Sequence, residues 1–167
     1  PHIPAPGETL AATDRQMFLG GKGANMSVAI ARSGSRVNHI GAIGGDGIWT
    51  GERLLEYGVD TQFIKVIAPQ TSQAVIAVDA KGENAIILAP GASVEIPQHL
   101  LQNALSEAST GDWFITQNET NLQRTGVTLA KKMGLKVGYA AAPFDADRVA
   151  AVLEHLDFLI LNAVEAQ

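Results

Sequence analysis

The feature that most constrains this chain is the segment from Leu19 to Ala29, in which three glycines stand within four positions: Gly20, Gly21 and Gly23. Glycine has no Cβ, so the backbone can turn sharply there and approach a ligand closely. A helical pattern of small and apolar residues follows and stops at Gly34. The first N–H groups of such a helix have no partner inside it and point toward whatever the loop holds. Lys22 adds a positive charge and Asn25 adds an amide in the first turn. The segment favours a site for a polyhydroxylated or anionic small molecule.

A tight turn without any ligand explains the spacing of these glycines equally well. Two familiar phosphate-binding motifs are excluded. No Ser or Thr follows the Gly-Lys pair, as a P-loop requires, and the upstream glycine is missing. Met26 stands where a dinucleotide-binding fingerprint has its third glycine.

Beyond this segment, apolar runs and helical patterns alternate for most of the chain. Helices are predicted at 24–33, 51–57, 97–108, 120–133 and 145–155. Buried strands are predicted at 36–43, 112–116, 135–140 and 157–161. Such alternation is typical of a doubly wound, Rossmann-like α/β sheet with helices on both faces. His39 is expected to pack or to hydrogen-bond within the sheet, and Asp46 to serve a turn or a helix cap.

The segment from residue 61 to residue 89 has a different character. Three short β-rich runs, at 63–67, 73–78 and 84–88, are separated by turn residues, which predicts a small antiparallel sheet. A short strand or two is expected in residues 10–19. We therefore divide the chain into an α/β core (20–59 and 93–167) and a β lid (1–19 and 60–92).

Composition narrows the class of protein. The chain of 167 residues is 46% hydrophobic and 17% charged, which indicates a well-buried α/β fold. A net charge of −5 argues against binding to nucleic acid or to an anionic membrane. There is no cysteine, which excludes disulfides, thiolate nucleophiles and cysteine-based metal sites. A cytoplasmic location is expected, with no membrane partner.

Several segments, in the same order along the chain, resemble one family. The run from Gly20 to Asn25, followed by an Ala-rich helix, is similar to the first signature of the ribokinase-like (PfkB-type) carbohydrate kinases. The prolines of residues 1–9 resemble that family's path into its lid. Gln117-Asn118-Glu119 resembles its Gln-x-Glu, and the Asn162 to Glu165 segment resembles its Asn-x-x-Glu. One departure is Ala140, where the family commonly has Asn.

The resemblance implies a role for each matching residue. Gly21, Lys22, Gly23 and Asn25 would bind a sugar. Glu119 would bind another sugar hydroxyl; a plain acidic residue near a helix start is the alternative. Asn162 and Glu165 would organise nucleotide phosphates, with Glu165 holding Mg²⁺ through water.

The implied reaction is transfer of the ATP γ-phosphoryl group to a sugar hydroxymethyl, with ribose to ribose 5-phosphate as the first candidate. ATP is the co-substrate, Mg²⁺ the cofactor and K⁺ a further ion to test; a homodimer through the lid is expected. The family's opening strand and the signature that carries its catalytic base are not matched; the base is expected beyond Gln167. The chain is therefore interpreted as a truncated fragment that is inactive alone.

Two alternatives remain open from the sequence. The parent protein could act on another sugar or on a nucleoside, since the Ala140 departure weakens the match to ribose-specific members. The chain could instead be a non-catalytic module that binds sugar or dimerises. The signature that carries the family's catalytic base, if found in the parent protein, separates a kinase from the non-catalytic module.

Overall fold

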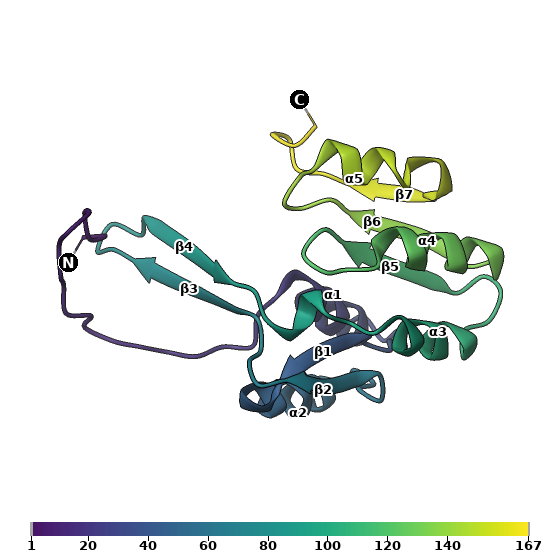
Figure 1. The fold of residues 1–167 in the computed structure, drawn as a ribbon, viewed down its shortest axis with the longest axis horizontal. Coiled ribbons are helices and arrows are strands. Elements are labelled where there is room, and N and C mark those ends of the chain that lie inside the picture. The colour runs from purple at the N-terminus through teal and green to yellow at the C-terminus, as the bar shows by residue number, and fades with distance from the viewer. Residues whose placement is uncertain (1, 167) are drawn as a thin grey trace.

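The computed structural model describes residues 2–166 and has an α/β architecture (Figure 1). Its strands are β1 (Gly41–Gly44), β2 (Ile64–Ala68), β3 (Gln73–Val78), β4 (Asn84–Ala89), β5 (Trp113–Gln117), β6 (Lys136–Ala140) and β7 (Phe158–Ile160). Its α-helices are α1 (Lys22–Arg32), α2 (Ile48–Glu56), α3 (Gln98–Ser106), α4 (Gln123–Lys132) and α5 (Ala146–Ala150). Short 3₁₀ turns are η1 (Gly45–Gly47), η2 (Ala92–Val94) and η3 (Leu153–His155).

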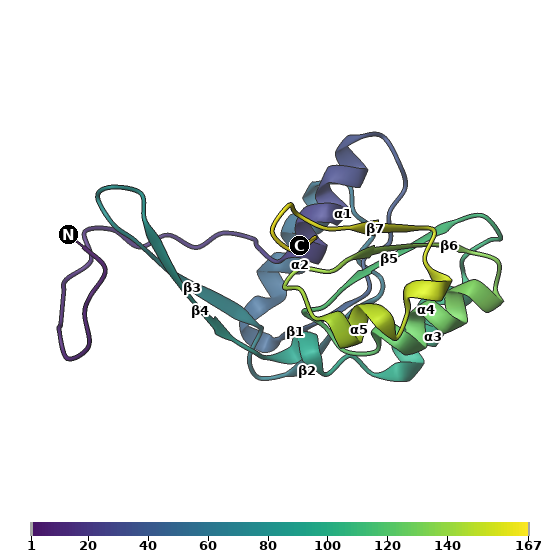
Figure 2. The same cartoon turned by 90° about the horizontal axis from the view of Figure 1, so that it is seen from above.

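The strands form two parallel sheets and one antiparallel hairpin. β1 pairs in parallel with β2, and β5, β6 and β7 form a parallel sheet in that order. Figure 2 shows α1 and α2 on one side of the parallel strands and α3, α4 and α5 on the other. This arrangement confirms the predicted doubly wound class. None of the helices in residues 2–166 combines the length and apolar character that crossing a membrane requires.

The lid is smaller than the sequence predicted. β3 and β4 form a two-stranded antiparallel hairpin that projects from the parallel strands (Figure 1). β2 does not join it, because Ile64 and Val66 pair with the parallel neighbour β1. The prediction of a third antiparallel strand at 63–67 is therefore wrong, since that run continues the core sheet. The prediction of strands in residues 10–19 is also wrong, because that segment is extended and unpaired. The division of the chain at residues 60 and 93 stays a prediction.

Several helix boundaries also differ from the predictions; for example, α2 begins at Ile48 and α3 ends at Ser106. α1 begins at Lys22, because Gly21 takes a positive φ of 93° and turns the chain directly into the helix. α4 begins at Gln123, after Leu122 adopts a left-handed conformation with φ 64°. The predicted helix at 145–155 is divided into α5 and η3, because Val152 leaves helical geometry (φ −127°, ψ −9°) with its side chain 1% exposed in the core.

The core consists of three apolar clusters that match the layers. The largest packs α4 beneath β5 to β7 and includes Val127, Val137 and Tyr139, all fully buried. A second joins β1 to α3, and a third joins α1 to α2. Ile40 and Leu122 pack against both of the first two clusters. These contacts hold the two parallel sheets together although β1 and β5 are not hydrogen-bonded to each other.

A cavity of about 2640 Å³ lies between the facing edges of β1 and β5. Ala42 lines it from β1, and Phe114 and Thr116 line it from β5. The glycine segment, the base of the lid and the loop after β5 also reach it. Four of the predicted sugar-binding residues, Gly21, Lys22, Gly23 and Glu119, line this cavity.

Candidate functional site

The glycine segment places Lys22 at the edge of the cavity. Gly21 is the cap residue before α1, and its carbonyl accepts the first helical hydrogen bond from the Asn25 N–H at 2.9 Å. Gly23 lies within the first turn, where a Cβ would stand 3.3 Å from Nε2 of Gln117. The missing side chain at Gly23 therefore allows α1 to approach the end of β5 closely.

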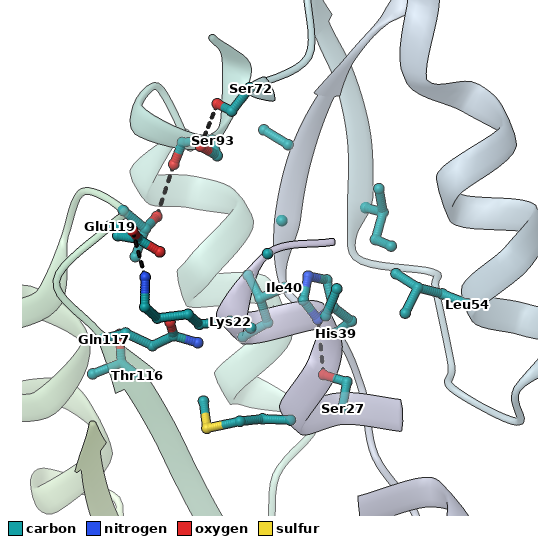
Figure 3. Close-up of a pocket in the computed structure, with 18 of the residues that line it drawn as sticks. Lys22, Ser27, His39, Ile40, Leu54, Ser72, Ser93, Thr116, Gln117 and Glu119 are labelled. Carbon is teal, nitrogen blue, oxygen red and sulfur yellow. Dashed lines mark hydrogen bonds and ion pairs between the residues drawn. The ribbon is translucent and has the colours of Figure 1, made fainter. Parts of the chain in front are cut away.

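Glu119 lies just beyond the carboxyl end of β5 and meets Lys22 across the cavity. Lys22 Nζ and Glu119 Oε1 are 2.6 Å apart (Figure 3). The Lys22 side chain is 44% exposed and the Glu119 side chain 31% exposed, so both can still reach a ligand. A cation with several donors and a carboxylate acceptor, side by side and partly solvated, can bind neighbouring hydroxyls of a polyol.

His39 supports this arrangement from beneath. Its Nδ1 is 2.9 Å from Ser27 Oγ on α1, and its ring lies against Gly23 and Gly41. Burial lowers the pKa of His39, so the ring is neutral near pH 7. The His39 ring packs as expected, but its side-chain hydrogen bond is made to Ser27 on α1 and not within the sheet.

The base of the lid is attached to the core by a second group of contacts. Asp46, in η1, accepts hydrogen bonds from the Thr71 N–H at 2.7 Å and the Thr71 hydroxyl at 2.8 Å. These two bonds lower the pKa of Asp46. Asp46 therefore stabilises the turn η1, as expected, and also connects this turn to Thr71 at the start of the lid.

A series of hydroxyl contacts continues from the lid toward Glu119. Ser72 Oγ and Ser93 Oγ are 2.5 Å apart, and the Thr120 hydroxyl donates to the Ser93 carbonyl at 2.8 Å. Figure 3 shows Ser72, Ser93, Glu119 and Lys22 along one wall of the cavity. The two ends of the hairpin are therefore joined to each other and to the loop that carries Glu119.

Asn162 and Glu165 form a compact turn after β7. The Asn162 N–H donates to Glu165 Oε2 at 2.9 Å, and Asn162 Oδ1 accepts from the Glu165 N–H at 2.8 Å. Each side chain thus braces the other's backbone, and both remain at least partly accessible. The pair lies at the carboxyl end of its strand, as Glu119 does, but outside the lining of the large cavity.

The structure brings together most of the predicted sugar-binding residues. Gly21, Lys22, Gly23 and Glu119 all line the large cavity. Asn25 does not; it lines a separate groove of about 490 Å³ beside residues 17–19 and α2. Ala24 and Ser27 are buried toward the sheet, and helical side chains are about 100° apart per residue, so Asn25 is rotated to a different face of α1.

Sequence reasoning missed other residues that line the cavity. Ser72, Ser93 and Thr120 are not among the predicted site residues, and Gln117 appears only as part of a motif, yet all four line the cavity. Ser72 lies just before β3, Ser93 lies in η2, and Thr120 lies in the loop after β5, so only Gln117 and Thr120 carry the signal of a position at the carboxyl end of a parallel strand. Their mutual contacts required the three-dimensional structure.

Comparisons with known proteins agree with the observed fold. Residues 2–167 match the family described as pfkB family carbohydrate kinase. The chain is 33% identical to ribokinase from Haemophilus influenzae over 174 residues, covering 100% of this chain and 56% of that protein. A solved ribokinase from Cryptococcus neoformans in complex with ADP has a TM-score of 0.81 and 35% identity, covering 99% of this chain and 52% of that one.

A ribokinase structure from Thermotoga maritima is similar to the same degree, with a TM-score of 0.81 and 31% identity, covering 98% of this chain and 54% of that one. This chain therefore spans about half the length of the relatives that it matches.

Proposed function

We propose a sugar-kinase function for the whole protein, starting from the fact that this chain belongs to the PfkB family of carbohydrate kinases. The reaction is transfer of the ATP γ-phosphoryl group to a sugar hydroxymethyl, with ribose as substrate and ribose 5-phosphate as product. The observation that carries the proposal is the Lys22–Glu119 pair, which joins the glycine segment to the end of β5 at 2.6 Å. Similarity to several ribokinases supports ribose as the first candidate.

In this proposal the sugar lies against the Lys22–Glu119 pair. Glu119 accepts hydrogen bonds from sugar hydroxyls, Lys22 donates to a sugar oxygen, and the backbone at Gly21 and Gly23 allows close approach. Asn25 remains part of the proposed site, although it lines the neighbouring groove; a rotation at the start of α1 would be needed to bring its amide to the sugar.

The edges of β1 and β5 also fit the family architecture. Residues of both strands line the cavity, including Ala42 of β1 and Phe114 of β5, and β1 and β5 are not hydrogen-bonded to each other. We propose that a strand from another part of the whole protein pairs with both edges and completes one sheet. The catalytic base is likewise assigned to the remainder of the protein, so the 167-residue chain alone is expected to be inactive.

Nucleotide phosphates are assigned to the turn that contains Asn162 and Glu165. Residues 2–166 contain no cluster of three His, Cys, Asp or Glu side chains that could hold a metal. A single carboxylate at Glu165 fits Mg²⁺, which retains several waters and binds phosphate oxygens. Bound Mg²⁺ would neutralise charge on the transferred phosphoryl group. We also propose ATP as the co-substrate and K⁺ as a further ion, and we assign no further residues to them. A cytoplasmic location is part of the same proposal.

A homodimer through the lid is also part of the proposal. Side chains on both faces of the hairpin are exposed, including Ile76, Ile87 and Leu88 at 54%, 70% and 59%. An apolar two-stranded ribbon of this kind is stabilised when another surface covers it. A second copy of the lid would supply such a surface.

The direct test is to incubate the whole protein with ATP, Mg²⁺ and ribose and to identify the product by phosphorus NMR. Ribose 5-phosphate is the expected product. Phosphorylation of another sugar or of a nucleoside would keep the kinase and replace the substrate. Binding of sugar without any phosphoryl transfer would favour the second candidate, a non-catalytic sugar-binding module. One observation supports that candidate: the Lys22–Glu119 pair forms within this chain alone.

A further inference from the structure

Asn118 is buried between the two residues of β5 and its loop that face the cavity. Only 6% of Asn118 is exposed, and it separates Gln117 from Glu119. Its Nδ2 donates to the carbonyls of Ala141 at 3.0 Å and Pro143 at 2.7 Å. Its Oδ1 accepts a hydrogen bond from the Tyr139 hydroxyl. The side chain therefore joins the end of β5 to β6 and to the loop that follows β6.

The backbone of Asn118 is held as firmly as its side chain. The Asn118 carbonyl accepts from Arg148 Nη1 at 2.8 Å and from Gln123 Nε2 at 3.3 Å. These donors come from α5 and α4, so four separate segments converge on one residue. Within residues 2–166, no buried side-chain nitrogen or oxygen lacks a hydrogen-bond partner. The network is thus complete, which is the condition under which a buried polar group fixes a local geometry.

Glu119 follows directly in the chain and has a different environment. Its side chain is partly exposed, and its carboxylate reaches the ion pair with Lys22 by extending into the cavity. On the other flank, the Thr120 hydroxyl donates to the Ser93 carbonyl. Because an exposed side chain has little packing of its own, the place of the carboxylate depends on the backbone that Asn118 and Thr120 hold. Binding is stronger when such a group is already in position before the ligand arrives.

We propose that Asn118 is a positioning residue for sugar binding: its buried amide fixes the backbone at Glu119 and so sets the carboxylate opposite Lys22. This inference rests on the proposed function, since it assigns Glu119 to the sugar. In this proposal Asn118, which is 6% exposed, acts through the backbone at Glu119 and does not itself bind the sugar.

The test uses the whole protein with Asn118→Leu, alone and combined with Tyr139→Phe. Leucine has a similar size but cannot make the three side-chain hydrogen bonds, which leaves the Tyr139 hydroxyl buried without a partner. Adding Tyr139→Phe removes that stranded hydroxyl, and the double variant should recover part of the lost stability, because replacing both partners by apolar groups is far less costly than removing one. The Glu119 backbone remains without its amide anchor in both variants.

Asp157→Asn is the matched control. Asp157 accepts from the Val137 N–H at 2.6 Å and from Lys131 Nζ at 3.1 Å, so the variant weakens the same three-stranded sheet at the end away from the site. The measurements are the ribose dissociation constant by calorimetry, the urea midpoint, and the backbone NMR order parameters at residues 119–121.

The expected result is a dissociation constant about ten-fold higher in both Asn118 variants, corresponding to loss of roughly one well-placed hydrogen bond to a charged group. The dissociation constant should stay high in the double variant, and the order parameters at 119–121 should be lower in both Asn118 variants. The control should match wild type in both measurements. A dissociation constant that returns to the wild-type value in the double variant would overturn the proposal. So would a dissociation constant that changes in step with the urea midpoint in all variants, because binding would then follow stability alone.

Failure of the proposed function is recognised separately. If the wild-type protein binds no sugar, the sugar assignment fails, and the order parameters then decide the positioning role alone. Lower order parameters at 119–121 in the double variant but not in Asp157→Asn would support that role. Equal order parameters in all of these proteins would refute it.

Discussion

The Glu119→Gln substitution separates a binding role from a merely structural ion pair. Glutamine keeps the size of the side chain and one oxygen acceptor but removes the negative charge. The ion pair with Lys22 is short, at 2.6 Å, yet its side chains are 44% and 31% exposed. Exposed pairs contribute about 0.2–1 kcal/mol to stability. The loss of folding stability should therefore stay below about 1 kcal/mol, which moves the melting temperature by at most a few degrees, about 4 °C for a domain of this size.

The effect on sugar binding should be larger. A hydrogen bond to a charged group contributes about 1.5–3 kcal/mol, which corresponds to roughly a 10- to 150-fold change in affinity. Because Glu119 binds the sugar equally in the ground state and during transfer, KM for ribose should rise by that factor with kcat nearly unchanged. Steady-state kinetics of the whole protein and a thermal melt measure both quantities.

A matched control is available on α2. Arg53 and Glu56 form an exposed pair at 2.7 Å, with side chains 52% and 62% exposed. Glu56→Gln removes a charge from a similar pair that is not part of the large cavity, and it should leave KM at the wild-type value. A Glu119→Gln enzyme whose KM for ribose stays within about two-fold of the Glu56→Gln enzyme, well under the smallest shift expected, would refute the assignment of Glu119 to the sugar.

Three further predictions concern the supports of the site. A Cβ at Gly44 would lie 2.3 Å from the carbonyl carbon of Gln70, whereas a Cβ at Gly45 meets nothing within 4 Å. Gly44→Ala should therefore lower the free energy of unfolding by about 1–3 kcal/mol, and Gly45→Ala should lower it much less. Equal urea midpoints for the two variants would contradict this prediction. Burial holds the pKa of His39 below its ordinary value of 6.5, so the unfolded chain takes up that proton first and stability should fall as the pH drops below about 6.5. Urea midpoints at pH 7.5 and 5.5 should differ less in His39→Gln than in wild type; an identical difference would rule out His39 as a cause. Ile87→Glu places a charge on the exposed lid, so it should shift the dimer of the whole protein toward monomer in analytical sedimentation. A wild-type protein that sediments as a monomer would contradict the dimer proposal.

Much of the core was predictable because its signals are local. The β5, β6 and β7 strands are short apolar runs between helical patterns, and glycines such as Gly134 follow the helices that they end. β2 was misassigned because its run looks the same whether its partner is parallel or antiparallel. Only pairing with β1, far away in the sequence, decides the sheet to which it belongs.

The site was predictable in part for the same reason. Lys22 and Glu119 were each recognised from the motif around them, and the structure supplies their contact. Asn25 was placed with Lys22 because the two are close in sequence, although the orientation of α1 turns them toward different hollows. The network around Asn118 could not be predicted from local pattern, since its side-chain partners and Arg148 lie 21 to 30 residues away and only Gln123 is near in sequence.

The most direct test of the central claim is the initial rate of ATP consumption by the whole protein. Ribose, fructose, 2-keto-3-deoxygluconate and adenosine should be compared as acceptors, with the 167-residue chain assayed beside it. We expect turnover by the whole protein, highest with ribose, and none by the short chain. Absence of turnover with every acceptor would contradict the kinase function, and turnover by the short chain would contradict the assignment of the catalytic base to the rest of the protein.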